Sequence, residues 1–438
     1  MRTVLAVICT ACAAFAQYGG PAILSRGDAP AAMTGADVSF RPFVEVSAVY
    51  STGLAAGVAL DSAGNIANHS SIGAQISGGI SGAHNWRHTT LGISYRGSYS
   101  RYTSNEKFSS TDQSLLLGLR RQLSPHVVLS IDESAGIFNR NAGLLATISP
   151  SVPFDPAQSY VPTTDFFDNR TIFSSTQIGM AVQRSTRTSW SFSGGLFDTH
   201  RQSAALYGVI GENASADYQY RITKRMTIGG NYNYSHFGYG RLASDTNMHG
   251  GSGSLAYQMS RFWEFTGYAG FYRVESKFIQ NVPVDPAIAA IIGITQSSEV
   301  VYTVRYTPNF SARLSRTFHK GVLYFYGGHT VTPGNGLFLT STAYAAGSGY
   351  TYTGLRKWSF GATGSYHDSD SIGNVQGGYA SVVGVAHMSR QVARSMHAIL
   401  SFNVQRYSSG TFAKYNNVVY SGSLGLGWSP GVVPLRIW

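Results

Sequence analysis

The segment SYHDSDSIGN, residues 365–374, holds the most enzyme-like arrangement of residues in this chain. His367 and Ser369 are two residues apart, a spacing that puts both side chains on one face of a β-strand. There an imidazole can activate a hydroxyl for nucleophilic attack. Asp368 and Asp370 offer hard oxygen ligands of the kind that Ca²⁺ prefers. We favour a third interpretation, a solvated loop, because Asp, Ser and Gly are ordinary turn residues.

Other reactive groups are sparse. The 12 histidines are scattered, and His84 and His88, which have the separation of a helical zinc motif, straddle a predicted turn. Glycine runs such as GGSGS at 250–254 lack the Lys-Ser/Thr that follows a phosphate-binding loop. We therefore expect no metal, no cofactor and no enzymatic activity.

The composition is unusual for a soluble protein. Charged residues make up 12% of the 438 residues, whereas soluble domains carry about 25%. Glycine (50), Tyr (27) and Phe (23) are abundant, and the mean hydropathy is −0.05. After the N-terminus there is no run of about 18 apolar residues, so no transmembrane helix is expected. Such a balance favours strands with one apolar and one polar face.

The N-terminus, MRTVLAVICTACAAFAQ, indicates export. Arg2 precedes an apolar stretch that ends in Ala14-Phe15-Ala16, which fits a signal peptide at 1–16 cleaved after Ala16. An uncleaved anchor or a lipoprotein that uses Cys12 are the alternatives. Since Cys9 and Cys12 are the two cysteines, the mature chain would hold no disulfide and no thiol site. Residues 17–39 show no period and predict a flexible periplasmic linker.

From Phe40 onward, apolar residues alternate with small or polar ones over about ten residues at a time, which predicts β-strands long enough to cross a bilayer. The clearest segments are 72–80, 91–99, 190–196, 228–235, 302–311, 358–363, 396–405 and 418–428.

The connections between these segments are alternately short and long. Short, basic connections are centred near residues 85, 123, 186, 223, 260, 318, 356 and 392. Longer ones cover 51–69, 140–169, 238–247, 275–297, 330–343 and 367–376. Eight short turns join sixteen strands, and one more strand at each end gives about 18, with 16 as the alternative.

A closed antiparallel transmembrane β-barrel over 40–429 accounts for this pattern. In lipid every backbone polar group must be paired within the protein, and only a closed sheet has no edge. The apolar face would meet lipid and the polar face would line a wet lumen. A soluble propeller is the structural alternative, but its packed sheets would need apolar residues on both faces.

The architecture resembles Gram-negative outer-membrane β-barrels of the porin type, with a narrower likeness to acidobacterial barrels in GPAILSR and in the C-terminal tail. The resemblance implies short turns and both termini in the periplasm, long loops outside, and an aromatic-ended last strand that the barrel assembly machinery reads. Residues that match this signal are Tyr420, Leu424, Leu426 and Trp428, with Trp438 as a second aromatic end. The His-x-Ser pair at 367–369, with Asn374 nearby, is similar to that of outer-membrane phospholipases.

Extending the alternation places charged side chains on the lumen face, where rings of charge tune ion passage. These are Arg96, Arg120, Asp132, Asp217, Arg221, Glu264, Arg305 and Arg313, together with Glu45. Internal ion pairing that stiffens the wall is the equal alternative. Glu133 falls on the lipid face, which indicates either a bulge or a register error of one residue.

Two long connections, 140–169 and 275–297, are apolar and contain proline, and we expect at least one to fold into the barrel mouth. The tail 430–438 lacks alternation, so we expect no further strand but a segment that hangs on the periplasmic side or tucks back against the lumen. The sequence thus predicts an outer-membrane barrel that forms a passive, water-filled pore for small polar solutes. Its partners would be outer-membrane lipids and the assembly machinery; basic residues and aromatics share no face, so nucleic acid is not expected. A surface hydrolase and a plugged structural or adhesive barrel are the alternatives, and the sequence does not indicate an oligomeric state.

Overall fold

The computed structural model describes most of the chain from residue 38 onward. The described residues are 38–54, 69–103, 109–138, 170–202, 206–240, 242, 244–283, 296–334, 336, 339–352, 354–372, 377–410, 416–430 and 433–435. The expected signal peptide, most of the linker, Asn374 and Trp438 therefore lie outside them.

Nineteen strands form one antiparallel sheet. They are β1 (Val38–Leu54), β2 (His69–Asn85), β3 (Thr89–Tyr102), β4 (Ser110–Ser124), β5 (Val127–Phe138), β6 (Thr171–Gln183), β7 (Thr188–Arg201), β8 (Val209–Arg221), β9 (Met226–Tyr239), β10 (Ser244–Gln258), β11 (Trp263–Pro283), β12 (Gln296–Phe318), β13 (Gly321–Thr332), β14 (Ser341–Tyr352), β15 (Trp358–Ser371), β16 (Gly378–Gln391), β17 (Met396–Ser408), β18 (Asn417–Trp428) and β19 (Val433–Leu435).

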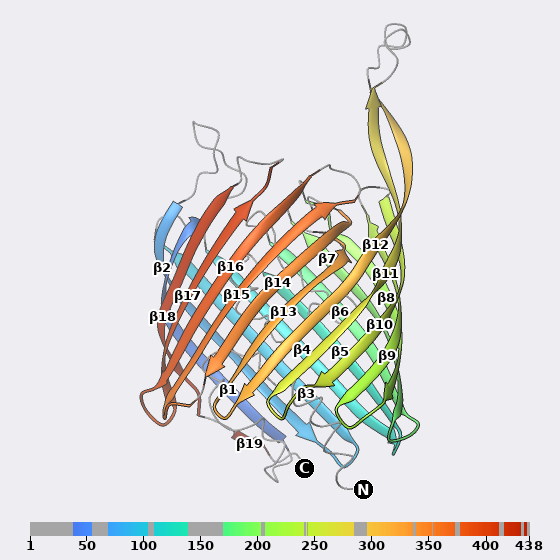
Figure 1. The fold of residues 1–438 in the computed structure, drawn as a ribbon. Helices are drawn as coiled ribbons and strands as arrows, with labels where there is room; N and C mark the ends of the chain where they lie inside the picture. Colours follow the sequence, from blue (N-terminus) through green and yellow to red (C-terminus); the bar gives the residue numbers. More distant parts are fainter. Residues whose placement is uncertain are drawn as a thin grey trace.

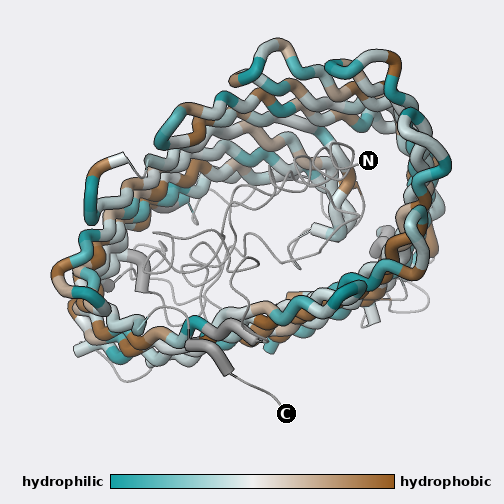
Figure 2. Tube along the Cα trace, turned by 90° about the horizontal axis from the view of Figure 1, so that it is seen from below, coloured by the Kyte–Doolittle hydropathy of each residue, from teal (hydrophilic) through white to brown (hydrophobic). Residues whose placement is uncertain are grey.

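The first eighteen strands close into a barrel of tilted strands (Figure 1). Each strand pairs with the next in sequence, and β18 pairs with β1 from Val44–Trp428 to Ser51–Ser421. Figure 2, seen along the barrel axis, shows a continuous wall with an elongated outline. The expected fold, including 18 strands and the eight short turns, is confirmed. Among the described residues, no helix is long and apolar enough to cross a membrane.

The two faces of the wall differ as the alternation predicted. The register puts large, exposed apolar side chains on one face, such as Val46, Ile76 and Leu424. We call this face the outer wall. Among the described strand residues, Leu116 is the one large, exposed apolar side chain on the inner wall. The outer wall is therefore built for lipid and the inner wall for water.

Four expectations about connections need correction. The predicted connection 275–297 is partly strand, because β11 continues to Pro283 and β12 begins at Gln296. Residues 367–371 belong to β15, and the 238–247 connection is mostly strand, because β9 continues to Tyr239 and β10 begins at Ser244. The tail also forms a strand: β19 pairs with the start of β1, Val38 with Leu435 and Phe40 with Val433. A three-residue strand is too short to show a period of two, so alternation did not reveal it.

The long-loop end of the barrel is uneven at β12 and β13. The β11–β12 hairpin stands above the rim (Figure 1), with pairing that continues to Pro283 and Gln296. The β12–β13 ladder, in contrast, ends at Phe310 and His329. Above that pair, none of the described strands pairs with β12 on its β13 side.

Pro308 explains where this ladder ends. Its carbonyl oxygen accepts a hydrogen bond from His329 Nδ1 at 2.6 Å, so this side of the residue points toward β13. The N–H and C=O of a strand residue point to the same side. The N–H that Pro308 lacks would therefore point toward β13, and proline is tolerated at such an edge.

Candidate functional site

The mouth of the barrel is narrowed by the connection between β13 and β14. We call residues 333–340 the mouth segment; positions 335, 337 and 338 lie outside the described residues. The Tyr239 hydroxyl of β9 donates to the Pro333 carbonyl at 2.9 Å and lies 3.1 Å from Thr340 Oγ1. Thr340 Oγ1 also lies 2.7 Å from Thr246 Oγ1 of β10. The mouth segment therefore passes on the lumen side of β11 and β12 and contacts the inner wall at β9 and β10.

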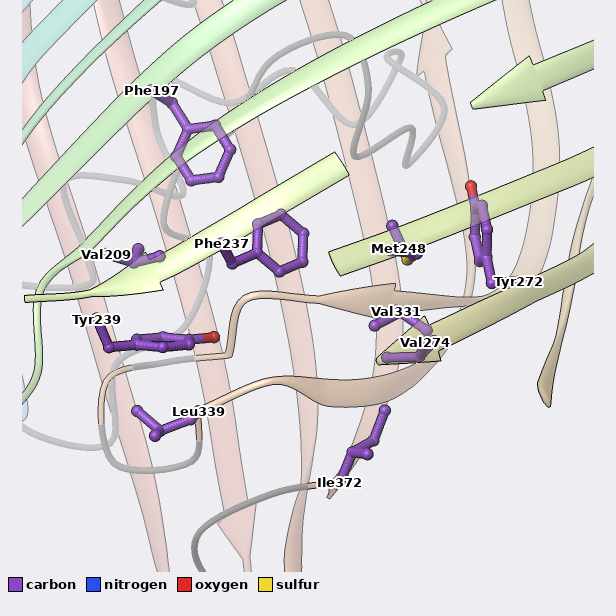
Figure 3. Packing of buried hydrophobic residues seen from close by; sticks show 10 residues of the cluster. All are labelled: Phe197, Val209, Phe237, Tyr239, Met248, Tyr272, Val274, Val331, Leu339 and Ile372. Atoms are coloured by element: carbon purple, nitrogen blue, oxygen red, sulfur yellow. The ribbon is translucent and has the colours of Figure 1, made fainter. Parts of the chain in front are cut away.

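An apolar cluster holds the mouth segment in place (Figure 3). Leu339, with Val331 of β13 and Ile372 after β15, packs on inward-facing side chains of β7–β11. Those side chains are Phe197, Val209, Phe237, Tyr239, Met248, Tyr272 and Val274. Without this cover they would face water, so burial of apolar surface favours the inward fold.

Gly336 brings the mouth segment against Tyr207 and Arg201, between β7 and β8. Its φ is +89°, a conformation that other residues rarely adopt. Its carbonyl accepts a hydrogen bond from the Tyr207 N–H at 2.9 Å. A Cβ at this position would lie 2.8 Å from Cδ of Arg201, a buried side chain that donates to the Tyr207 carbonyl. A side chain at 336 would thus displace the segment.

The charged residues predicted for the lumen lie on the inner wall. Their register partners are small or polar inner-wall residues: Gly79 for Arg96, Ser130 for Arg120, Gln177 for Asp132, Asn231 for Asp217, Thr227 for Arg221 and Ser315 for Glu264. Arg305 and Arg313 lie on the same face of β12, opposite Val274 and Thr266.

Several of these charges have an opposite charge nearby. Arg96 acts electrostatically on Glu45, and Arg120 acts on Asp132. Glu264 acts on Arg313, whose guanidinium also lies 5.1 Å from the Tyr324 ring. This arrangement favours local pairing along the wall over a single ring of one sign.

Asp217 belongs to a polar strip that the sequence reasoning did not identify. Its carboxylate accepts hydrogen bonds from Asn231 Nδ2 and, at 3.5 Å, from Ser191 Oγ. Asn233 in turn donates to Asn231, and Ser252 Oγ lies 3.5 Å from Asn231 Oδ1. Four neighbouring strands thus present amides, hydroxyls and a carboxylate to the lumen. The repeat of Asn at 231 and 233 is the signal that could have identified it.

The hydroxyl of the possible catalytic pair belongs to a buried residue, Ser369. His367 and Ser369 do share the inner wall, as their spacing predicted, but the Ser369 side chain is 3% exposed. Asp368 and Asp370 are on the outer wall, opposite Tyr344 and Thr342. The solvated-loop interpretation was wrong because these residues are in β15. In the described part of the chain, no group of three or more His, Cys, Asp and Glu could hold a metal.

The residues that match the expected assembly signal are on the outer wall of β18. Tyr420, Leu424, Leu426 and Trp428 are all exposed, and Trp428 pairs with Val44 on one side and Met396 on the other.

Comparison with protein-family models and with curated proteins finds no match. Several solved structures are similar to the chain. The copper transporter OprC has a TM-score of 0.44 at 9% identity, over 90% of this chain, which spans 65% of OprC. Pseudomonas aeruginosa OccK2 (OpdF) has a TM-score of 0.44 at 10% identity, covering 91% of this chain and 99% of OccK2. For the FrpB iron transporter of Neisseria meningitidis (F3-3 variant) the TM-score is 0.40 at 10% identity, over 84% of this chain and 62% of FrpB. The closed barrel itself confirms the outer-membrane type of architecture.

Proposed function

We propose that this protein is an outer-membrane channel that admits small polar solutes by passive diffusion. The observation that carries the proposal is a closed barrel with an apolar outer wall and a polar inner wall, narrowed at the long-loop end by the mouth segment. A soluble sheet has no need of a polar inner surface enclosed by an apolar outer one. A plugged structural barrel has the same two walls and differs from a channel in admitting no solute.

The inner wall supplies two means of selection. The mouth segment sets the size of solute that enters. Below it, the strip around Asp217 offers donors and acceptors that replace the hydration of a polar solute. Inner-wall charges that have no partner of opposite sign nearby would contribute more to ion selectivity than the paired charges, because a nearby opposite charge cancels much of the field.

Liposome swelling with neutral sugars of increasing size tests the proposal. Vesicles that contain the purified protein should swell in a monosaccharide and respond less as the sugar grows. Failure to swell in any sugar would exclude an open channel.

The mouth segment has its own test. Replacement of 334–339 by Gly-Ser-Gly should raise single-channel conductance in planar bilayers and admit larger sugars. Shortening 286–293 in the projecting β11–β12 hairpin is the matched control and should leave conductance unchanged. If the wild type, the 334–339 replacement and the shortened 286–293 variant had equal conductance, the constriction would lie elsewhere.

A further inference from the structure

Two tryptophans on the outer wall, at the short-turn end of the barrel, are each paired with an arginine. Trp263, the first residue of β11, is the cross-strand partner of Arg316 on β12. Trp358, the first residue of β15, is the cross-strand partner of Arg390 on β16. The guanidinium carbon lies 5.2 Å from the ring centroid in the first pair and 4.9 Å in the second. We call these two pairs the Trp–Arg sites.

The rings orient both guanidinium groups but do not use their hydrogen-bond donors. The Arg316 guanidinium also lies 4.6 Å from the centroid of the Phe318 ring, so two rings hold it. Within the described part of the chain, no carboxylate or other acceptor binds the guanidinium of Arg316 or Arg390. A guanidinium carries five N–H donors in a planar fork that matches the oxygens of a phosphate. Each Trp–Arg site therefore has the chemistry of an oxyanion site.

The barrel also contains a matched position without an arginine. Trp190, near the start of β7, is the cross-strand partner of Tyr218 on β8, and the two ring centroids are 4.6 Å apart. Aromatic residues alone form the usual boundary of a transmembrane barrel. The arginines are therefore not required for that boundary, and they add a fixed positive charge at two places on it.

The charges around both sites have one sign. The short-turn parts of β12–β17, which are residues 311–326, 346–363 and 384–400, contain no Asp and no Glu. Their cationic residues are Arg313, Arg316, Lys320, Arg356, Lys357, Arg390 and Arg394. In this region the ammonium group of a zwitterionic headgroup would find no carboxylate. A headgroup with a net negative charge would meet only cations.

Exposed apolar wall continues from each site. Leu323, the partner of Arg316 on β13, is followed two residues later by Phe325, which is 46% exposed. Beside Arg390, Leu400 of β17 is 43% exposed. An anion with acyl chains would cover this surface, whereas a free phosphate would leave it bare. Four strand spacings of about 4.8 Å separate β12 from β16, so one headgroup cannot reach both arginines.

We propose that the two Trp–Arg sites bind anionic phospholipids, one lipid at each site. The lipid phosphate accepts hydrogen bonds from the guanidinium, and the acyl chains lie along the apolar outer wall. The ligand class is a glycerophospholipid whose headgroup carries a net negative charge, such as phosphatidylglycerol. Binding at these sites does not depend on whether the lumen conducts solutes.

Native mass spectrometry of the purified full-length protein tests the two sites. In detergent, the wild type should retain up to two molecules of phosphatidylglycerol, and severalfold less phosphatidylethanolamine of the same acyl chains. Arg316→Gln should retain at most one phosphatidylglycerol, as should Arg390→Gln, and the variant with both changes should lose the preference between the two lipids. Glycerol phosphate, which has no acyl chains, should not displace the bound lipid. Heat-modifiable mobility on gels verifies that each variant forms a barrel.

Two matched variants separate the Trp–Arg sites from the general charge and the aromatic boundary. Arg121 is on the outer wall at the same end of β4, but its partners, Thr89 and Leu129, carry no ring, so Arg121→Gln should retain lipid as the wild type does. Trp358→Leu keeps Arg390 but removes its ring, and should weaken retention, whereas Trp190→Leu should not.

Three results would overturn the proposal. The first is equal retention of phosphatidylglycerol and phosphatidylethanolamine by the wild type. The second is a loss in Arg121→Gln as large as in Arg390→Gln, because any cation at this end would then attract the lipid. The third is displacement of the lipid by glycerol phosphate, because the sites would then recognise phosphate without the acyl chains.

Discussion

At the scale of single residues, the mouth segment depends on a few polar contacts. The Tyr239 hydroxyl joins Pro333 and Thr340 to the wall, and Gly336 adopts a backbone conformation that excludes most side chains. Both residues act on the position of the segment and leave the barrel wall intact. Changes here should therefore alter conductance before they alter barrel stability.

Tyr239→Phe should loosen the mouth segment. The change removes the donor to Pro333 and costs about 0.5–1.5 kcal/mol, the usual net value of such a hydrogen bond. We expect more frequent conductance fluctuations in single-channel recordings. Tyr220→Phe, on the outer wall of β8, is the control. If that variant showed the same conductance fluctuations, the mouth segment would not be their cause.

Gly336→Ala should displace the segment further. A side chain at positive φ costs about 1–2 kcal/mol, and the new Cβ would press on Arg201. We expect a larger mean conductance. Gly364→Ala, where the added Cβ meets nothing within 4 Å, should behave as wild type. An unchanged conductance in Gly336→Ala would contradict the prediction and show that the mouth segment keeps its position despite the added Cβ.

At the scale of elements, the seam between β12 and β13 sets the shape of the long-loop end. The ladder ends where Pro308 removes a donor and the buried His329 side chain binds the carbonyl of that residue. Because β13 is released from β12 there, it can carry the mouth segment inward, while the β11–β12 hairpin continues upward.

His329→Ala should weaken this seam. The ring is 3% exposed and lies 4.0 Å from the Tyr344 ring, so its removal leaves a cavity as well as an unmade hydrogen bond. We expect a loss of about 2–4 kcal/mol in the free energy of unfolding, measured by urea titration of tryptophan fluorescence. His200→Ala, at an exposed position, should cost little. If both variants lost the same free energy of unfolding, the seam between β12 and β13 would have no special role in stability.

The sequence predicted the elements better than the loops. A period of two and the short basic connections identify the strands because every residue of a barrel strand must face either lipid or water. The expectation that 140–169 or 275–297 folds inward stays a prediction: 139–169 and 284–295 lie outside the described residues, and the other residues of 275–297 continue β11 and β12. The mouth segment was missed because its apolar partners, such as Phe197, Phe237 and Tyr272, are spread over five strands, β7 to β11, and meet only in the closed barrel.

At the scale of the whole molecule, the inner wall presents paired and unpaired charges to the lumen. Arg96 interacts electrostatically with Glu45, and Arg313 with Glu264. The Asp217 carboxylate, in contrast, accepts hydrogen bonds from neutral donors. A carboxylate without a nearby cation attracts cations into the lumen, and salt screens that attraction.

Asp217→Asn should therefore reduce the preference for cations over anions, with little change in conductance. The shift in reversal potential under a salt gradient measures it, and the shift should shrink as ionic strength rises. Asp198→Asn, which removes a carboxylate from the outer wall, is the control. An equal shift in both variants would point to a general surface-charge effect.

The short strand β19 has a consequence for chain connectivity. It brings Val433–Leu435 alongside Val38–Phe40, so the last and first described segments of the chain are paired strands at the short-turn end (Figure 1). Chain ends that lie together tolerate circular permutation. A gene that joins Leu435 to Val38 through a brief linker, and opens the chain between β5 and β6 at the long-loop end, would encode the same barrel with its termini on the opposite side of the membrane.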